Sequence, residues 1–384
     1  MSTMSQAEQT NTAQTAAAAT LDTTLQCNSC GATLHYAPGT HHLLCTYCGA
    51  ANEIADTDTS PIVSFDYQDF ITNKLLNGET AQQAKIVSCK NCGASTTLPP
   101  EVNSDNCAFC ASPLVISEAE NRQIVKPHYI LPFLVPQTQA LESFRGWLKG
   151  LWFAPSDLSK MDSGGDARQL KGIYIPHWSY DTDTVSDYTG SRGEYYYVTE
   201  TYTENVDGED VVRTREVRQT AWYPASGTVA SSFNDIMISA SNSLPQKVAN
   251  RLEPWRLQSL VHYNEQYVSG FRSELFQIDA EAGLETAKSR MDPPIRQTII
   301  RDIGGDEQSI HGYETIYNNI ALKYLLLPVW ISAYKYNNKL YHFTVNACTG
   351  EVVGERPYSA AKITLAVIAG IALIIFIIMM LSNK

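Results

Sequence analysis

The sequence predicts an α+β protein with two small four-cysteine modules, a mixed body rich in antiparallel β-strands and one C-terminal transmembrane helix. Three observations lead to this prediction. Eight of the nine cysteines fall into two matched sets, strand-type sequence rich in Tyr, Val and Thr starts near residue 171, and residues 363–381 carry no charge. A chain of 384 residues is long enough for two or three domains. Its net charge of −12 argues against nucleic-acid binding as the main activity, because neutralising phosphates requires Lys and Arg.

Residues 1–24 are predicted to be a disordered tail. They contain no Lys or Arg and no apolar run, whereas a secretory signal needs a basic start and an apolar core. A polar segment of this kind has too little apolar surface to offset the entropy lost on folding.

The strongest signal is an internal repeat of paired cysteines, in residues 25–54 and 86–117. Fourteen residues separate the inner cysteines in both copies, and both copies open with C-x-x-C-G-A. Four thiolates at this spacing are typical of tetrahedral zinc. The sequence therefore predicts two zinc ribbons with one Zn2+ each, whose ligands are Cys27, Cys30, Cys45 and Cys48 in the first and Cys89, Cys92, Cys107 and Cys110 in the second.

A module of about 28 residues buries too little surface to fold unaided, and a structural metal supplies the missing free energy. Iron, redox-active cysteine pairs, structural disulfides and a histidine ligand from His41 or His42 are alternatives that we rank behind four-cysteine zinc. Glycine follows three of the four C-x-x-C pairs and Ala111 follows the last, so we expect the fourth turn to differ slightly.

Neither module has the basic stripe that a DNA-binding surface normally carries. Residues 25–54 contain Glu53 and no Lys or Arg, and residues 86–116 contain Lys90 against Glu101 and Asp105. This charge pattern favours contact with proteins, or a purely structural role, over contact with nucleic acid.

Residues 55–85 are predicted to be a spacer, in which residues 65–76 have the apolar spacing of an amphipathic helix. The body covers residues 126–358. A helix is expected at 139–153, strands at 171–230 with a hairpin turn at 205–208, and strands again at 308–356. Between these strands, residues 234–302 are predicted to be helical, with boundaries at Pro254, Pro293 and Pro294.

A second repeat lies in the body. Residues 171–178 (KGIYIPHW) match residues 323–330 (KYLLLPVW) in register, which predicts two related β-units. The proline in each copy predicts an edge strand or the start of a strand, because proline cannot donate to a β-ladder.

No motif of a known chemistry is found. The chain contains no phosphate-binding loop, no dinucleotide-binding glycine motif, no nucleophile elbow and no H-E-x-x-H helix. We therefore assign no catalytic and no cofactor-binding residue and expect no enzymatic activity. The pairs His177/Asp181 and His262/Glu265 are not placed together by any sequence signal, and Cys348 is expected in the core.

Residues 363–381 (ITLAVIAGIALIIFIIMML) are predicted to span a membrane. As a helix they would be about 29 Å long, which matches the hydrocarbon core of a bilayer. Arg356 and Lys362 precede the span and agree with the positive-inside rule, although Glu351 and Glu355 lie nearby. We expect a tail-anchored protein of the inner membrane, with its N-terminal body in the cytosol.

The two cysteine sets, together with the phrases LLPVW (326–330), IGGDEQ (303–308) and VNACTGEVVGERP (345–357) and the terminal span, resemble a bacterial family. These are membrane-anchored double zinc-ribbon (TFIIB-type) proteins, often labelled "primosomal protein N-prime, superfamily II helicase". The helicase label has no support in this chain, which lacks a place for ATP. The resemblance implies protein partners of the flotillin-like SPFH type or the phage-shock protein A type, at a membrane under envelope stress.

The function predicted from these observations is a zinc-ribbon adaptor that recruits partner proteins to the membrane. Two alternatives remain open at this point. The first is that the aromatic β-body is a ligand-binding or enzymatic domain, which clustered titratable groups in a deep pocket would favour. The second is that the protein is a membrane-tethered nucleic-acid-binding regulator, an alternative that rests on the type of module alone.

Overall fold

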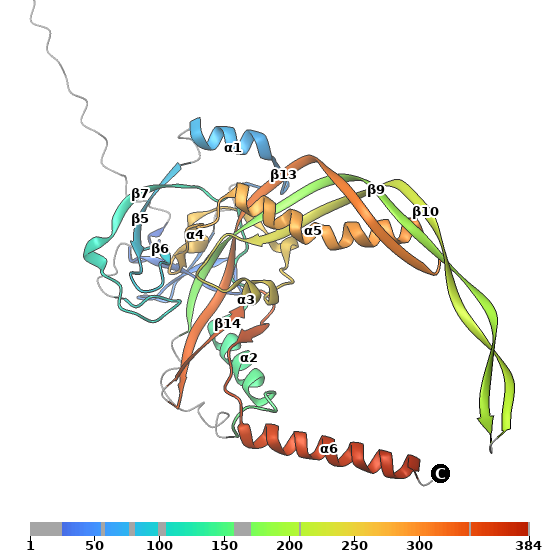
Figure 1. The fold of residues 1–384 in the computed structure, drawn as a ribbon. Helices are drawn as coiled ribbons and strands as arrows, with labels where there is room; N and C mark the ends of the chain where they lie inside the picture. Colours follow the sequence, from blue (N-terminus) through green and yellow to red (C-terminus); the bar gives the residue numbers. More distant parts are fainter. Residues whose placement is uncertain are drawn as a thin grey trace, which may run out of the picture.

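The computed structural model describes residues 25–54, 58–76, 81–98, 105–156, 170–206, 209–337 and 339–382. It shows a mixed α+β protein with a strand-rich body, from which a long β-arm and a C-terminal helix extend separately (Figure 1). The predicted tail at 1–24 lies outside the described residues.

Six α-helices are described. They are α1 (Tyr67–Leu76), α2 (Gln137–Lys149), α3 (Gln246–Arg251), α4 (Glu265–Val268), α5 (Ala280–Ile303) and α6 (Ala360–Ser382). Helix α1 lies in the spacer, where the apolar spacing predicts a helix, and α2 lies where the sequence predicts the first helix of the body.

The strands form one large sheet and two small ones. The first cysteine module contains β1 (Leu34–Tyr36), β2 (His42–Cys45) and β3 (Ala51–Glu53). The sheet of the second contains β5 (Ala81–Ser88), β6 (Ser95–Thr97) and β7 (Glu120–Val125), in the order β6-β5-β7, and so begins before and ends after the predicted bounds 86–117. The large sheet contains β4 (Phe65–Asp66), β8 (Tyr129–Ile130), β9 (Lys171–Val206), β10 (Glu209–Ser239), β11 (Val261–His262), β12 (Arg272–Ser273), β13 (Glu307–Tyr336), β14 (Lys339–Asn346) and β15 (Val352–Gly354).

The centre of the large sheet runs in the order β10-β9-β13-β14-β15, and all of these neighbours are antiparallel. Strands β9 and β10 form one long hairpin, paired from His177↔Ser239 to Val206↔Glu209. The turn predicted at 205–208 therefore lies at the tip of this hairpin, and its residues 207–208 are outside the described part.

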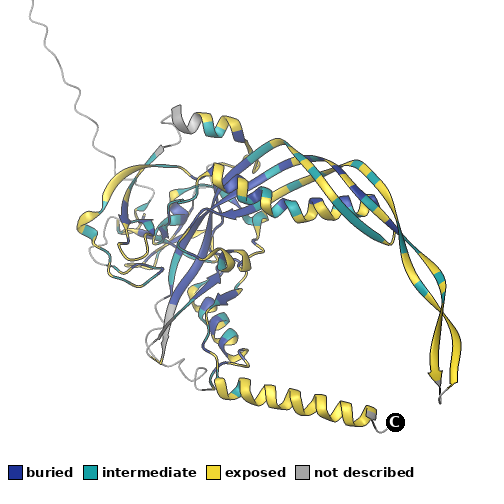
Figure 2. Ribbon diagram, viewed as in Figure 1, coloured by how far each residue is buried: buried dark blue, intermediate teal, exposed yellow. Residues whose placement is uncertain are grey.

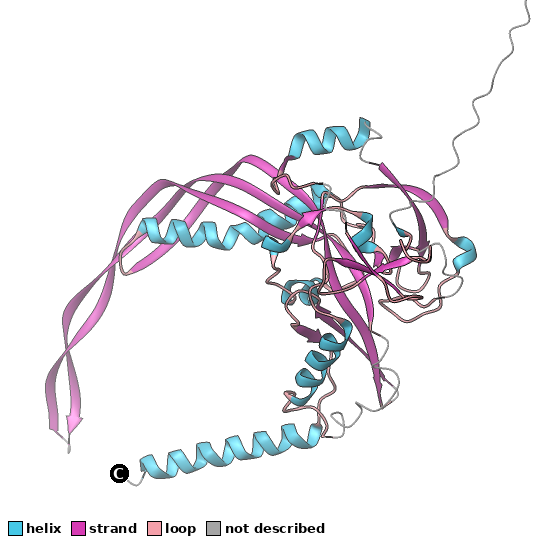
Figure 3. Ribbon diagram, turned by 180° about the vertical axis from the view of Figure 1, so that it is seen from behind, coloured by secondary structure: helices cyan, strands magenta, loops and turns pink. Residues whose placement is uncertain are grey.

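The outer part of the hairpin is a two-stranded arm. Strand β13 accompanies β9 only as far as Gly193↔Glu307, so residues 194–206 and 209–221 pair with each other alone. Figure 3 shows the strands passing from the body into this arm, and Figure 2 shows that burial gives way to exposure along it.

The two copies of the second repeat lie side by side as antiparallel partners, with Pro176 opposite Leu326 and Pro328 opposite Tyr174. The expectation that each proline marks an edge strand or a strand start is wrong, because β9 and β13 are central strands. Strands β9 and β13 pair with each other on one side, and each proline lies just beyond the point where pairing on the opposite side stops. Strand β10 ends opposite His177, and the pairing of β14 stops opposite Val329. The missing N–H thus costs no ladder bond there.

The tryptophans of the repeat are core residues. Trp178 and Trp330 are buried, and each indole N–H donates to a backbone carbonyl, Trp178 to Ile278 at 2.9 Å and Trp330 to Val135 at 2.8 Å. A buried tryptophan needs such a partner for its one donor.

Helix α5 corrects the sequence prediction for Pro293 and Pro294. Both lie inside the helix rather than at a boundary. A proline inside a helix costs roughly 3 kcal/mol, because it lacks a donor and crowds the preceding turn. Burial of Met291, Ile295 and Ile299 against the large sheet offsets that cost.

Both cysteine modules pack into the body. Leu34 and Leu43 of the first share a core with Phe133 and Phe144, whereas Phe109 of the second shares a core with the central strands. Backbone hydrogen bonds complete both contacts, from Tyr36 N to Ser269 O at 3.0 Å and from Leu275 N to Ser95 O at 2.9 Å. The modules are therefore parts of one body and not appendages.

Helix α6 is exposed throughout residues 363–381 (Figure 2). Residues Ala360–Leu381 are long and apolar enough to cross a membrane, and none of their most hydropathic stretch is buried against the protein. A core helix of a soluble protein would be mostly buried, so the exposure agrees with the predicted membrane anchor.

Candidate metal centres

The structure brings the eight predicted cysteines together as two groups of four, Cys27, Cys30, Cys45 and Cys48, and Cys89, Cys92, Cys107 and Cys110. Within each group all sulfur atoms lie within 4.8 Å of one another. The first group contains neither His41 nor His42, and no other metal-sized group of His, Cys, Asp or Glu occurs in the part of the chain that the structure describes.

The sulfur–sulfur distances distinguish metal binding from disulfide bonding in these groups. Cys27–Cys48 and Cys30–Cys45 are 3.6 Å apart, and the equivalent pairs of the second group are 3.5 and 3.6 Å apart. A disulfide needs about 2.05 Å, and all nine cysteines are free thiols here. Four sulfurs around zinc at about 2.3 Å would be about 3.8 Å apart in a tetrahedron. Each group can therefore close around one metal ion after a small adjustment.

The C-x-x-C turns that carry the ligands are alike. In each turn the first cysteine accepts a bond from the N–H four residues on, as between Gly31 N and Cys27 O at 2.8 Å. The residue after the second cysteine is in the left-handed region in all four turns, which are those of Gly31, Gly49, Gly93 and Ala111.

Backbone N–H groups also point at sulfur. Ser29 N lies 3.4 Å from Cys27 Sγ, and Cys48 N lies 3.5 Å from Cys45 Sγ. The Ser29 N–H lowers the pKa of the Cys27 thiol to about 6, because a donor favours the thiolate. The side chain of Asn52 adds a longer contact of 3.9 Å to Cys27 Sγ. These donors favour the thiolate at Cys27, whereas the pKa of Cys30 in the same group is raised by its hydrogen bond with Cys48.

Ala111 keeps the left-handed turn at φ 58° without being glycine. This conformation costs roughly 1–2 kcal/mol for a residue with a side chain, while glycine loses more entropy on folding. We expect Ala111→Gly to stabilise the second module by about 0.5–1 kcal/mol. Thermal unfolding of the metal-loaded protein measures this change.

Gly93 provides the matched control for that substitution. It occupies the equivalent turn of the same module at φ 77°, and a Cβ there would meet no atom within 4 Å. Gly93→Ala should therefore destabilise through the backbone alone. Equal melting temperatures for Ala111→Gly and the wild type would show that the left-handed turn carries no strain.

The two modules present their second turns differently. Tyr47 of the first is 84% exposed, whereas Phe109, its counterpart in the second, is 6% exposed. The second module is fastened further by Asp105, which pairs with Lys171 at 2.6 Å and with Arg272. Of the two second C-x-x-C turns, only that of the first module therefore exposes an aromatic side chain to solvent.

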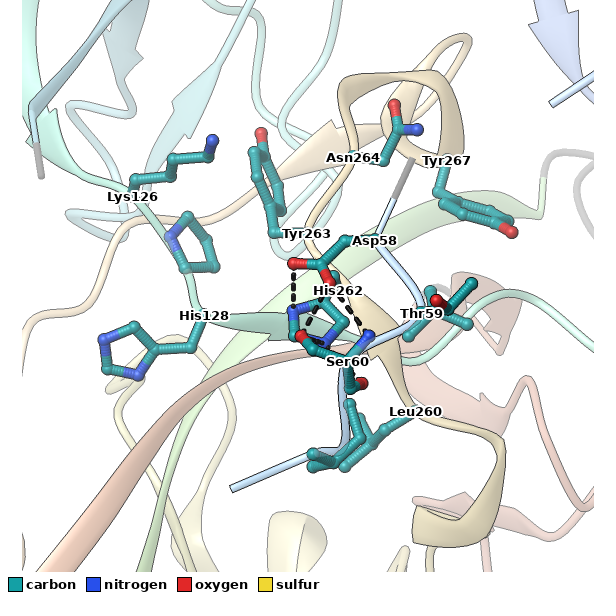
Figure 4. A pocket seen from close by; sticks show the side chains of 13 residues that line it. Asp58, Thr59, Ser60, Lys126, His128, Leu260, His262, Tyr263, Asn264 and Tyr267 are labelled. Atoms are coloured by element: carbon teal, nitrogen blue, oxygen red, sulfur yellow. Dashed lines mark hydrogen bonds and ion pairs between the residues drawn. The ribbon is translucent and has the colours of Figure 1, made fainter. Parts of the chain in front are cut away.

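A separate pocket of about 480 Å3 lies between the spacer and the body (Figure 4). Here Asp58 Oδ2 lies 3.3 Å from Nδ1 of His262, and Ser60 Oγ lies 3.1 Å from Nε2. The atoms match the list of a serine–histidine–aspartate relay. No sequence signal connects the spacer with His262, and the structure pairs His262 with Asp58.

The geometry of this group is that of a clamp. In a relay the hydroxyl and the carboxylate lie at opposite ends of the imidazole ring. Asp58 and Ser60 do contact different ring nitrogens here, but Ser60 Oγ donates its proton to Asp58 Oδ1 at 2.6 Å, and the Ser60 carbonyl lies 3.0 Å from the same Nε2. A relay instead needs the hydroxyl proton to face the ring. The ring thus fastens the spacer to the body.

Two other histidines, His128 and His177, are largely buried and contact backbone groups. Burial lowers the pKa of His128 and of His177 to about 4. His128 Nδ1 accepts from Tyr324 N at 3.0 Å, and Nδ1 of His177 lies 3.2 Å from the Ile175 carbonyl. The pair His177/Asp181 does not form, because Asp181 binds Lys323 at 3.1 Å instead.

The chain is similar to a Bacillus subtilis (strain 168) protein named "Uncharacterized protein YdjG". The two are 24% identical over 247 residues, which cover 64% of this chain and 68% of the relative. No protein-family model and no solved structure matches. The cysteine groups and helix α6 are therefore the features of the molecule that bear on its function.

Proposed function

We propose that this protein is a membrane-anchored adaptor, in which two structural zinc ribbons and the β-body hold partner proteins at the cytosolic face of the inner membrane. The observation that carries the proposal is the joining of both four-cysteine groups to one body that also bears the exposed apolar helix α6. Such an arrangement supports the proposal, because it joins both modules to the same body that α6 would anchor.

Zinc is the proposed metal for both groups. All-sulfur tetrahedral sites within short turns are typical of structural zinc, and such closed sites leave no open position for catalysis. Cytosolic thiols are kept reduced, which agrees with free cysteines rather than disulfides. The cytosolic orientation is supported by Arg356 and Lys362 at the start of α6. The role in envelope stress rests on the family resemblance alone.

The proposed contact surface is the tip of the first module. Tyr47 is 84% exposed and Leu44 is 43% exposed, and residues 25–54 contain one acid and no Lys or Arg. Exposed aromatic side chains without surrounding charge are typical of the centres of protein interfaces.

Tyr47→Ser tests this surface, because Tyr47 packs against nothing that the fold needs. We expect at least a tenfold loss (about 1.4 kcal/mol or more) of the co-purifying partner, since a central aromatic residue commonly contributes about 2 kcal/mol or more to binding. Partner recovery is measured by quantitative mass spectrometry after gentle solubilisation of membranes.

Tyr197→Ser is the matched control, since Tyr197 is 64% exposed on the arm. Deleting the modules is a poor test, because both supply side chains to the core of the body. A partner lost equally from both tyrosine variants, or from neither, would contradict the assignment of this surface.

A further inference from the structure

The base of helix α6 is fastened to the end of helix α2. Ser359 N donates to the Phe153 carbonyl at 2.8 Å, and Lys362 Nζ donates to the Ala154 carbonyl at 2.8 Å. These two bonds join the segment that follows α2 to the point where α6 begins. Side chains next to this segment therefore lie at the level where α6 would enter a membrane.

Exposed aromatic side chains gather at this level. Trp152 is 80% exposed and Tyr358 is 60% exposed, and Phe153 is 37% exposed. Exposed tryptophan is uncommon on proteins surrounded by water, whereas Trp and Tyr are enriched at the membrane–water interface. The pattern places this end of the body in the headgroup region.

A cavity of about 500 Å3 opens at the same place. It is lined by Trp147 and Leu151 from the α2 end, Arg251 at the end of α3, Tyr341 of β14, and the β15 end with its continuation, Gly354, Glu355, Arg356 and Tyr358. Tyr358 lies two residues before Ala360, so this wall is within about 7 Å of chain from the first residue of α6.

The two arginines give the cavity its chemistry. Arg356 lies 5.2 Å from the centre of the Tyr358 ring, and its Nε is 3.4 Å from the Tyr358 hydroxyl. Among the described residues, neither arginine forms an ion pair with a carboxylate. Arginine forks match phosphate oxygens, and basic pockets beside membrane helices bind anionic lipid headgroups. Glu355 is the single acid in the wall.

We propose that this cavity binds the headgroup of an anionic phospholipid from the membrane that holds α6, with Arg251 and Arg356 on the phosphate and Trp147, Tyr341 and Tyr358 around the glycerol. The cavity volume suits one headgroup. The inference rests on the proposed membrane anchor and goes beyond it. It gives the body a fixed orientation relative to the bilayer and a preference for anionic lipid.

The test uses the full-length protein in a neutral detergent, titrated with phosphatidylglycerol or with phosphatidylcholine and read by native mass spectrometry. We expect one phosphatidylglycerol to be retained in preference to phosphatidylcholine. The double variant R251Q/R356Q should bind it about tenfold more weakly, because it loses charged hydrogen bonds to phosphate.

The control variant K149Q/K247Q removes the same charge from the exposed surfaces of α2 and α3 without touching the cavity wall, and it should bind like the wild type. Equal binding of both lipids, or equal loss in both double variants, would overturn the proposal. So would glycerol 3-phosphate that binds as tightly as the lipid, since this would indicate a soluble ligand.

The failure of the anchor itself is recognised separately, by alkaline carbonate extraction of membranes. Release of the wild-type protein into the soluble fraction would contradict the membrane anchor. Retention in the membrane without any preference for phosphatidylglycerol would contradict the headgroup site alone.

Discussion

Replacing Cys107 with serine is expected to empty the second metal site and to destabilise the whole body. Cys107 is buried and shares a core with the central strands. Structural zinc supplies roughly 10–16 kcal/mol of apparent binding free energy in small modules. Losing it therefore approaches or exceeds the total stability of an ordinary domain, about 5–15 kcal/mol. Metal content should fall by half, from two ions per chain to one.

Elemental analysis of the purified protein measures this loss, and thermal unfolding follows its effect on the fold. Cys348→Ser is the control, because Cys348 is equally buried but lies outside both groups. It should keep its full metal content and lose only about 1–3 kcal/mol, from burying a poorly bonded hydroxyl. Equal metal loss in the two variants would mean that the metal is not bound by the four-cysteine groups.

Trp178→Ala is expected to give the largest loss of stability among single substitutions in the strand-rich core. Trp178 is fully buried in the first copy of the repeat, and its indole N–H bonds to Ile278 O. Truncating such a residue costs about 3–5 kcal/mol, because the surrounding core fills the cavity only partly. In a protein of this size the melting temperature should fall by about 10 °C.

Trp222→Ala is the counterpart at the base of the arm, where Trp222 lies opposite Gly193 and is 48% exposed. This change should cost less than about 1 kcal/mol, as for most surface substitutions. Circular dichroism of the detergent-solubilised full-length chain measures both. Similar melting temperatures for the two variants would contradict the placement of the repeat at the centre of the sheet.

The metal groups were predictable because their information is local. Each C-x-x-C pair specifies its own turn, and the matched spacing of the two copies predicts which four sulfurs meet. The hairpin at 205–208 and the helix within 65–76 were predictable for the same reason, since turn residues and apolar spacing act over a few residues.

Features that depend on distant parts of the chain were missed. Pro293 and Pro294 are strong local signals for a helix end, but burial of α5 against the sheet overrides them. The docking of both modules, the clamp between Asp58 and His262 and the cavity at the base of α6 each join segments that no periodicity connects.

The measurement that tests the central claim most directly is X-ray absorption at the zinc edge of the full-length protein extracted gently from membranes, together with metal quantification. Two four-cysteine groups predict two zinc ions per chain, each with four sulfur neighbours at about 2.3 Å. Iron in place of zinc, nitrogen or oxygen in the first shell, or a metal-free protein with disulfides would contradict the account.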